Sequence, residues 1–270
     1  MTAATEPAIS RWRTIAVPFR RALWILVSLG SLLVAWQLLH SYVVNPHLLP
    51  SPGNVAMTGW KLLKSGELQQ HVLISLTRIG VGYTAGCVIG ITLGLLMGRS
   101  AVFHDLMAPV IELIRPISPI AMVPIVLIWL GVGETAKYVL VGYASVVIVL
   151  INTAFGVQNT PIIRERAATC LGASGRQVFL LVVLPSATPY IVTGMRMALG
   201  FSFMGIVAAE MVAAEAGIGF LIMQSRMFMQ VNYTFVGMLA LGVIGASSDL
   251  LFRLTVSRFA RRYQEELYNV

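Results

Sequence analysis

Long apolar runs separated by short polar segments dominate this chain. A helix that crosses the hydrocarbon core of a bilayer needs about 20 mostly apolar residues. Six runs are of about this length: 23–44, 72–98, 106–130, 138–157, 190–214 and 234–252. They predict an all-α, polytopic membrane protein with six transmembrane helices in one domain, 23–257, flanked by tails at 1–22 and 258–270. Because the first run is too long for a signal peptide and no small-residue cleavage site follows it, we expect a retained anchor.

The segment 158–185 is a polar insert between two apolar runs. Residues 165–171 have a helix-forming composition, and Gly172 can adopt the left-handed conformation that ends a helix. Ser174 followed three residues later by Gln177 fits a capping box, which starts a new helix that we expect to stop at Pro185. A plain connector needs only a few residues. The pattern therefore predicts a bent pair of short helices at the membrane surface.

Two spans carry special residues at regular spacing. The second run has glycines at every fourth position, namely Gly82, Gly86, Gly90, Gly94 and Gly98. Such a stripe predicts close packing against another helix, and sliding along the same groove is an open alternative. The third run contains four prolines, Pro109, Pro116, Pro119 and Pro124. Each removes a backbone donor and bends a helix, so we expect this span to be broken and buried in protein or against a cavity.

The composition excludes a soluble fold. The 270 residues are 57% hydrophobic and 11% charged, whereas soluble domains carry about a quarter charged residues. The net charge of +8 is explained by topology rather than by nucleic acid, because lysine and arginine collect on the cytoplasmic side of membrane proteins. With a cytoplasmic N-terminus, twelve arginines fall on that side: Arg11, Arg13, Arg20, Arg21, Arg99, Arg164, Arg166, Arg176, Arg253, Arg258, Arg261 and Arg262. The outer side holds only Lys61, Lys64, Lys137 and Arg226. Both termini and the insert 158–185 are then predicted to be cytoplasmic.

Ionisable residues at membrane depth are costly and suggest function. Glu112 and Arg115 can pair on one helical face, as can Asp249 and Arg253. Arg196 could attract a small anion, or bond to backbone carbonyls and headgroups. We predict the following residues as candidates for a substrate pathway: Arg115, Ser118, Pro119, Met122, Arg196, Ser202 and Glu210. For Glu210, near the outer end of its span, contact with a binding protein, an external gate and ordinary headgroup solvation remain open.

Catalytic and metal-binding residues are not predicted. The four histidines are scattered, and no pair has metal-ligand spacing on one helix. No phosphate-binding loop of the Gly-x-x-x-x-Gly-Lys-Ser/Thr type occurs. The two cysteines, Cys87 and Cys170, lie in an apolar run and in the polar insert, which argues against a disulfide framework. We therefore expect no enzyme activity and no cofactor in this chain.

The insert resembles the signature loop of the inner-membrane permeases of binding-protein-dependent ATP-binding-cassette (ABC) importers. That loop reads Glu-Ala-Ala, three residues, Gly, nine residues, Ile, one residue, Leu-Pro. The matching positions are Ala167, Ala168, Gly172, Leu184 and Pro185. Val182 replaces the usual Ile, and Arg166 replaces the usual Glu, with Glu165 one residue earlier. The segments 112–137 and 208–220 are similar to the permeases for nitrate, sulfonates and taurine.

This resemblance implies a MetI-like permease of a type I importer in the bacterial inner membrane. The expected partners are a second permease copy, so a homodimer, a dimer of ABC ATPase subunits that holds ATP and Mg, a periplasmic or lipid-anchored substrate-binding protein, and membrane lipid, but not nucleic acid. The residues implied in ATPase coupling are Glu165, Arg166, Ala167, Ala168, Gly172, Ala173, Ser174, Leu184 and Pro185. The expected cargo is a small anion such as a sulfonate, taurine or nitrate.

Two other functions compete with this one. A self-sufficient secondary transporter or channel would show paired broken helices in two inverted halves, yet only the third run is strongly broken by proline. A membrane scaffold without a substrate would not need prolines or an arginine along a pathway. Neither alternative explains the helix-turn-helix insert.

Overall fold

A computed structural model describes residues 24, 26–43 and 48–259 of the chain. The described residues form helices joined by turns, with no strand among them. The tail 1–22 and all but the first two residues of the tail 258–270 lie outside the described residues. The chain divides into two compact units, 1–61 and 62–270.

The first unit contains an apolar helix, Leu26–Tyr42, which ends in the π-helical turn η1 (Leu39–Val43). Side chains of this helix hold the segment that follows it. The Trp36 indole Nε1 donates to the carbonyl of Pro50 at 3.1 Å, and His40 Nδ1 lies 2.6 Å from the carbonyl of Leu49. Helix α2 (Pro52–Ser65) begins here and ends before Gly66, whose φ of 80° is left-handed.

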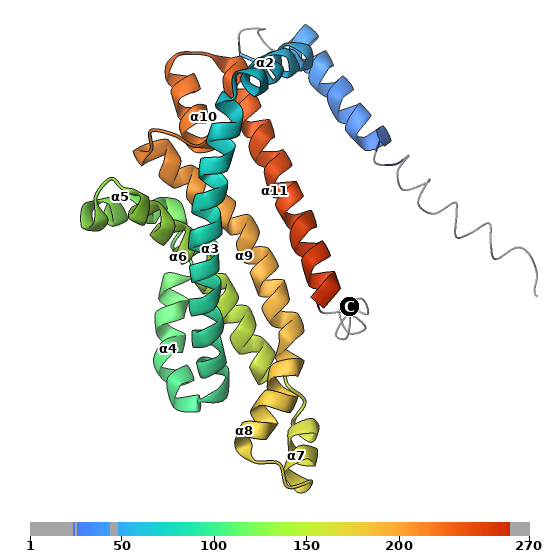
Figure 1. Cartoon of the computed structure of the whole chain (residues 1–270), viewed down its shortest axis with the longest axis vertical. Coiled ribbons are helices and arrows are strands. Elements are labelled where there is room, and N and C mark those ends of the chain that lie inside the picture. Colours follow the sequence, from blue (N-terminus) through green and yellow to red (C-terminus); the bar gives the residue numbers. More distant parts are fainter. Residues whose placement is uncertain (1–23, 25, 44–47, 260–270) are drawn as a thin grey trace, which may run out of the picture. The chain divides into compact units, whose positions relative to one another are not determined.

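The second unit is built on three long helices, α3 (Glu67–Arg99), α6 (Glu134–Gln158) and α9 (Leu184–Ala213), which run side by side (Figure 1). The remaining elements are α4 (Ala101–Ile114), α5 (Pro119–Leu130), α7 (Ile162–Cys170), α8 (Gly175–Val178), η2 (Phe179–Val183), α10 (Ile218–Met227) and α11 (Val231–Phe259). Helices α7 and α8 lie at one end of this unit, the α7 end, and α10 lies at the other, the α10 end (Figure 1).

The glycine stripe of α3 packs directly against α6, as predicted. The residues that face the five glycines are also four apart on α6, namely Val141, Ser145, Val149, Thr153 and Val157. A methyl group added at Gly94 would lie 2.6 Å from Thr153 Cβ and 2.7 Å from a backbone carbonyl. Since real side-chain contacts are not this short, only glycine allows the two backbones to approach so closely.

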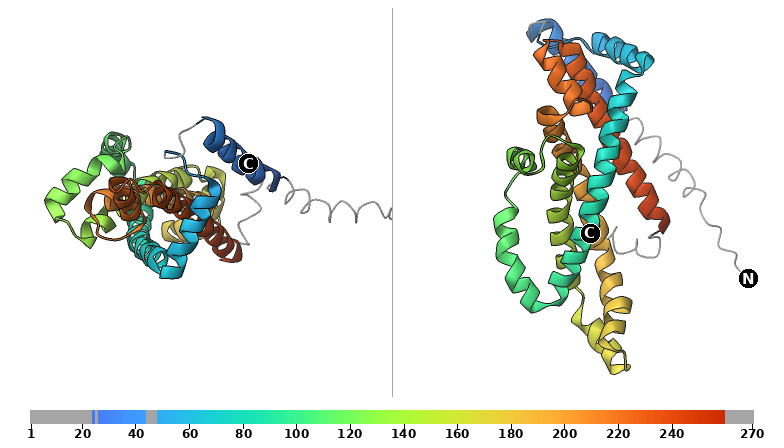
Figure 2. Two further views of the ribbon diagram at one scale, coloured as in Figure 1. Left: turned by 90° about the horizontal axis from the view of Figure 1, so that it is seen from above. Right: turned by 60° about the vertical axis from the view of Figure 1, so that its left-hand side comes forward.

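The four helices Glu67–Arg99, Glu134–Gln158, Gly175–Ala213 and Val231–Arg258 are long and apolar enough to span a membrane. The third predicted run forms α4 and α5, which are bent by 99° and together allow a fifth span. Figure 2 shows α4 turning back from the end of α3 before the chain changes direction into α5. The run 23–44 gives the shorter helix of the first unit, so the count of six spans stays a prediction.

The break in the third run falls between Ile114 and Pro119, where Pro116 and the Ser118 N-cap interrupt the helix. The Ser118 hydroxyl oxygen accepts a hydrogen bond from the Ile120 amide at 3.3 Å. The span is not interrupted at Pro109 or Pro124, because both lie inside continuous helices. A bend at these two prolines stays a prediction.

The expectation of a helix stop at Pro185 is also wrong. The chain remains helical from Gly175 to Ala213, a length of 39 residues. Pro185 lies in the first turn of α9, directly after the π-helical turn η2. The wider π turn accommodates the proline ring and its missing N–H, which would otherwise interrupt an α-helix. The second helix of the insert is therefore the beginning of a spanning helix.

Candidate functional site

The insert folds into the predicted pair of helices, and its turn is closed by two capping motifs. Gly172 has a φ of 87°. The Ala173 amide donates to the carbonyl of Ala168 and the Gly172 amide to that of Thr169, the two bonds of a Schellman motif. The Ser174 hydroxyl accepts from the Gln177 amide, and the Gln177 side chain accepts from the Ser174 amide, which completes the capping box. We call residues 162–178 the α7–α8 element.

One face of the α7–α8 element is attached to the bundle. Ala168 and Ala173 pack against a buried cluster that contains Val157 of α6 and Val183 of η2. Glu165 Oε2 lies 3.9 Å from Arg99 Nη1 at the end of α3, an exposed ion pair that contributes little to stability. The small side chains at 168 and 173 thus let the element sit close to the ends of α6 and α9.

The opposite face of the element is exposed and partly apolar. Leu171, at the turn, is 89% exposed, and Ile162 and Ile163 are 63% and 73% exposed. Arg166 and Ala167 are exposed too. Of the nine predicted coupling residues, seven lie in the α7–α8 element, and Leu184 and Pro185 lie half-buried in the first turn of α9. Their role in coupling stays a prediction.

A cavity of about 740 Å³ opens between α6, α9 and the bend that joins α4 to α5. Its polar lining side chains are Arg115, Ser118, Tyr143 and Asn152, and its apolar lining includes Met197, Phe201 and Met204. Three of the seven predicted pathway residues, Arg115, Ser118 and Pro119, line it. Among the described residues that line the cavity there is no aspartate or glutamate.

The predicted pairing of Glu112 with Arg115 is wrong for the part of the chain that the structure describes. Helix α4 ends at Ile114, so Arg115 already belongs to the bend. No ion pair with Glu112 forms, and both side chains are exposed. Instead, Tyr143 fastens the bend to α6, since its hydroxyl oxygen lies 3.1 Å from the Ile114 carbonyl and 2.9 Å from the Ile117 carbonyl.

The other four predicted pathway residues lie outside the cavity lining. Met122 packs against the buried cluster that includes Val123 of α5. The buried Ser202 hydroxyl donates to the Ala198 carbonyl and lies 2.9 Å from the Ser145 hydroxyl. Arg196 is paired with Asp249 and Glu210 with Arg78, as described next. A pathway role for these four stays a prediction.

Arg196 binds Asp249 of α11 through Nε at 2.7 Å and Nη2 at 3.1 Å. Arg253 binds the same carboxylate at 3.1 Å, which confirms the predicted pair of Asp249 with Arg253. The two alternatives for Arg196, a small anion or backbone carbonyls and headgroups, did not include this partner. The ion pair links α9 to α11.

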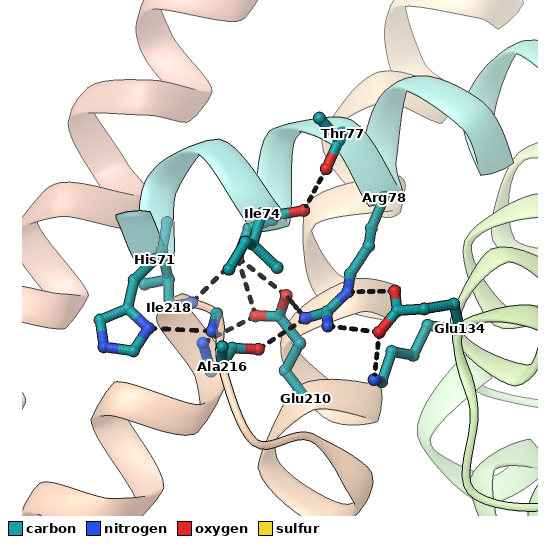
Figure 3. Close-up of polar contacts among 12 residues, drawn as sticks. His71, Ile74, Thr77, Arg78, Glu134, Glu210, Ala216 and Ile218 are labelled. Atoms are coloured by element: carbon teal, nitrogen blue, oxygen red, sulfur yellow. Dashed lines mark hydrogen bonds and ion pairs between the residues drawn. The ribbon is translucent and has the colours of Figure 1, made fainter. Parts of the chain in front are cut away.

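A charge cluster, buried except for the half-exposed Glu134, lies near the α10 end (Figure 3). Arg78 of α3 is placed between two carboxylates: it binds Glu210 of α9 at 2.8 Å and Glu134 of α6 at 2.6 Å. The Arg78 side chain is 5% exposed and that of Glu210 is 0% exposed, so the alternative of headgroup solvation for Glu210 is wrong. Lys137 adds a second cation, 2.7 Å from Glu134. Three spanning helices are thereby joined by charge.

The loop before α10 and the first turn of α10 complete the same cluster. The Glu210 carboxylate accepts hydrogen bonds from the Ser75 hydroxyl at 2.8 Å and from the Gly219 amide at 2.9 Å. The Gly217 amide donates to His71 at 3.0 Å. Gly217 has a φ of 127°, and a side chain there would collide with the Glu210 carboxylate. Sequence reasoning missed this cluster, although Arg78 inside an apolar run was a signal that an acidic partner must exist.

Residues 88–264 match the family described as the inner membrane component of binding-protein-dependent transport systems. The chain belongs to this family. It is accordingly a membrane permease subunit of a transport system, distinct from the subunit that hydrolyses ATP.

Named relatives agree with this assignment. The permease is 36% identical over 214 residues to the taurine transport system permease protein TauC of Escherichia coli K12, covering 76% of this chain and 78% of that protein. It is 35% identical to the nitrate import permease protein NrtB of Synechocystis, over 73% of this chain and 74% of that one. A protein of Bacillus subtilis provisionally named aliphatic sulfonates transport permease protein SsuC is 31% identical, over 74% of this chain and 73% of that one.

Solved structures share the fold. A chain of the methionine ABC transporter MetNI, in an inward-facing conformation, superposes with a TM-score of 0.60 at 19% identity, over 74% of the permease and 97% of that chain. A chain of a bacterial ABC transporter for the acidic polysaccharide alginate gives 0.59 at 16% identity, over 94% and 97%. The MetI-like, all-α fold predicted from the sequence is confirmed.

Proposed function

We propose that the permease forms the translocation pathway of an ABC importer for a small anion in the bacterial inner membrane, and that a separate ATPase drives it through the α7–α8 element. Relatives named for taurine, nitrate and sulfonates support the anionic cargo. The expected complex holds two permease copies, two ATPase subunits and an external substrate-binding protein.

The observation that carries the coupling role is the exposed apolar face of the α7–α8 element. Leu171 is 89% exposed at the tip of a turn that two capping motifs hold rigid. Exposed apolar side chains on a polar, well-ordered element are typical of protein interaction sites. The ATPase is the partner that a permease must contact, so we assign this face to it.

The continuous helix behind the element provides the mechanical link. Gly175–Ala213 contains 39 residues, which corresponds to about 58 Å at about 1.5 Å per residue. Its first turn belongs to the α7–α8 element, its middle lines the cavity, and its last turn carries Glu210 in the charge cluster. A movement of the docked element is therefore transmitted along α9 to the walls of the cavity, which opens or closes the pathway without chemistry in this chain.

The arginine distribution supports a cytoplasmic α7 end. Arg99, Arg164, Arg166 and Arg176 lie on or beside the α7–α8 element. Lys137, in the charge cluster, and Arg226, in α10, lie toward the α10 end. Lysine and arginine remain preferentially on the cytoplasmic side, where the ATPase is also expected.

The test is retention of the ATPase by variants of the exposed face. We expect Leu171→Ala to lower the amount of ATPase that co-purifies with the tagged permease by roughly tenfold, as for a central interface residue. The matched control is Leu73→Ala, which removes a leucine that is 64% exposed on α3, toward the α10 end. The coupling assignment is contradicted if Leu171→Ala retains the ATPase as well as Leu73→Ala does while both variants insert normally.

A further inference from the structure

The cavity contains one charged side chain, that of Arg115, at membrane depth. Tyr143 lies near the middle of α6, which is a spanning helix. Because the Tyr143 hydroxyl contacts the carbonyls of Ile114 and Ile117, the bend that carries Arg115 lies beside the middle of that span. An arginine at this depth must face water, a counter-ion or a ligand, since burial in hydrocarbon costs several kcal/mol.

The described residues provide no counter-ion for Arg115. They form no ion pair with it, and no carboxylate lines the cavity. Glu112, three residues earlier on α4, does not line the cavity. A cavity lined by one cation and no carboxylate attracts anions and repels cations.

Two further donors line the same cavity. The Ser118 hydroxyl oxygen accepts from the Ile120 amide, and its own hydrogen has no acceptor among the described residues. The Asn152 amide donates one hydrogen to the Ile148 carbonyl at 2.9 Å, which leaves its second hydrogen for a ligand. Tyr143, in contrast, donates its hydroxyl hydrogen to backbone carbonyls of the bend. It therefore positions Arg115 but has no hydrogen left to donate to a ligand.

The apolar part of the cavity lining favours a ligand that carries an alkyl chain. Met197, Phe201, Met204 and Met211 make most of this surface apolar, which suits an alkyl chain. The ammonium group of an amino-sulfonate would enter without a carboxylate to pair with and beside a like charge on Arg115, which is unfavourable. An inorganic anion such as nitrate has no alkyl group and would make no apolar contact with this surface.

We propose that this cavity is a binding subsite for an aliphatic sulfonate, with the sulfonate oxygens at Arg115 and the alkyl chain on the apolar wall, and that it discriminates against amino-sulfonates. The proposal names the cargo class of the pathway and so rests on the proposed function. The charge preference of the cavity is nevertheless a property of the permease itself and is measurable without transport.

The experiment places a cysteine in the cavity and measures how fast charged reagents modify it. Val147→Cys lines the cavity one helical turn after Tyr143 and is introduced together with Cys87→Ala and Cys170→Ala in the full chain in its membrane. The reagents are an anionic alkylsulfonate methanethiosulfonate and a cationic trimethylammonium methanethiosulfonate of similar size. For each reagent, the rate at Val147→Cys is divided by its rate with a free thiol in solution. We expect this normalised rate to be roughly tenfold higher for the anionic reagent than for the cationic one.

Two variants assign this preference to Arg115. Arg115→Gln is expected to abolish the preference and Arg115→Lys to retain it. The matched control is a chain that keeps the native exposed Cys170 on α7 and lacks Val147→Cys. In this chain, Arg115→Gln should leave the ratio of the anionic to the cationic rate at Cys170 unchanged. Equal rates at Val147→Cys, or a preference that survives Arg115→Gln, would overturn the proposal.

Protection by free ligands tests the cargo class. Butanesulfonate is expected to slow modification of Val147→Cys at concentrations where taurine and nitrate do not, and Arg115→Gln should remove this protection. Taurine or nitrate protecting as well as butanesulfonate would overturn the discrimination. Loss of ATPase binding in the Leu171→Ala variant is a separate measurement, so failure of the subsite and failure of the importer assignment are distinguishable.

Discussion

Arg78 and Glu210, 132 residues apart in the sequence, form a buried ion pair of 2.8 Å that joins α3 to the last turn of α9. Glu134 occupies the other side of the same guanidinium and joins α6. These ion pairs therefore fix the end of α9 that lies far from the α7–α8 element relative to α3 and α6.

We predict that Glu210→Gln destabilises the permease. Arg78 keeps its pair with Glu134, but the buried Arg78 Nη1, Ser75 hydroxyl and Gly219 amide lose a charged acceptor, which costs about 1–3 kcal/mol. The thermal stability of the solubilised chain, followed by the fraction that remains monodisperse after heating, checks this. Glu215→Gln, which changes an exposed glutamate in the adjacent loop, is the control and should have little effect. Equal stability of the two variants would show that the cluster does not hold the helices.

The glycine stripe gives a prediction with an internal control on the same helix. Gly94→Ala places a methyl group 2.6 Å from Thr153 Cβ, so α3 and α6 must separate, at a cost of about 1–3 kcal/mol. Gly80→Ala meets nothing within 4 Å and should be neutral or slightly stabilising. The same heating assay distinguishes them, and a neutral Gly94→Ala would contradict close packing as the role of the stripe.

A third prediction concerns the turn of the α7–α8 element. Gly172 has a φ of 87°, and a side chain in this left-handed region costs roughly 1–2 kcal/mol. Gly172→Ala should therefore loosen the turn that presents Leu171 and reduce co-purification of the ATPase, whereas the overall thermal stability should change little. Gly175→Ala, where there is space and no left-handed φ, should bind the ATPase normally. Identical binding by both variants would argue against a rigid turn as the docking feature.

Tyr143→Phe tests how Arg115 is positioned. The substitution removes the hydroxyl that holds the carbonyls of Ile114 and Ile117 and retains the ring. We expect the preference of Val147→Cys for the anionic reagent to fall severalfold because the bend no longer fixes the guanidinium. A merely structural role of Tyr143 would lower thermal stability and leave the ratio of reagent rates unchanged.

The sequence was most informative where local chemistry determines local structure. The Gly172 turn, the Ser174 capping box and the glycine stripe each follow from a few neighbouring residues, and each is confirmed. The predicted stop at Pro185 is wrong because the effect of a proline depends on the turn before it, here a π turn. The Arg78 cluster was missed because its carboxylates come from α6 and α9, and contacts between distant segments are not encoded in local spacing.

The most direct test of the central claim uses the native Cys170, which is exposed at the end of α7. A thiol-reactive, photoactivatable crosslinker attached there in native membranes should, on illumination, join the permease to an ATPase subunit that carries a phosphate-binding loop. Adding ATP should change the yield of this product, because the α7–α8 element moves with the ATPase. Crosslinks to lipid alone, from membranes in which the permease and its ATPase are both present and intact, would contradict docking of the ATPase on the α7–α8 element.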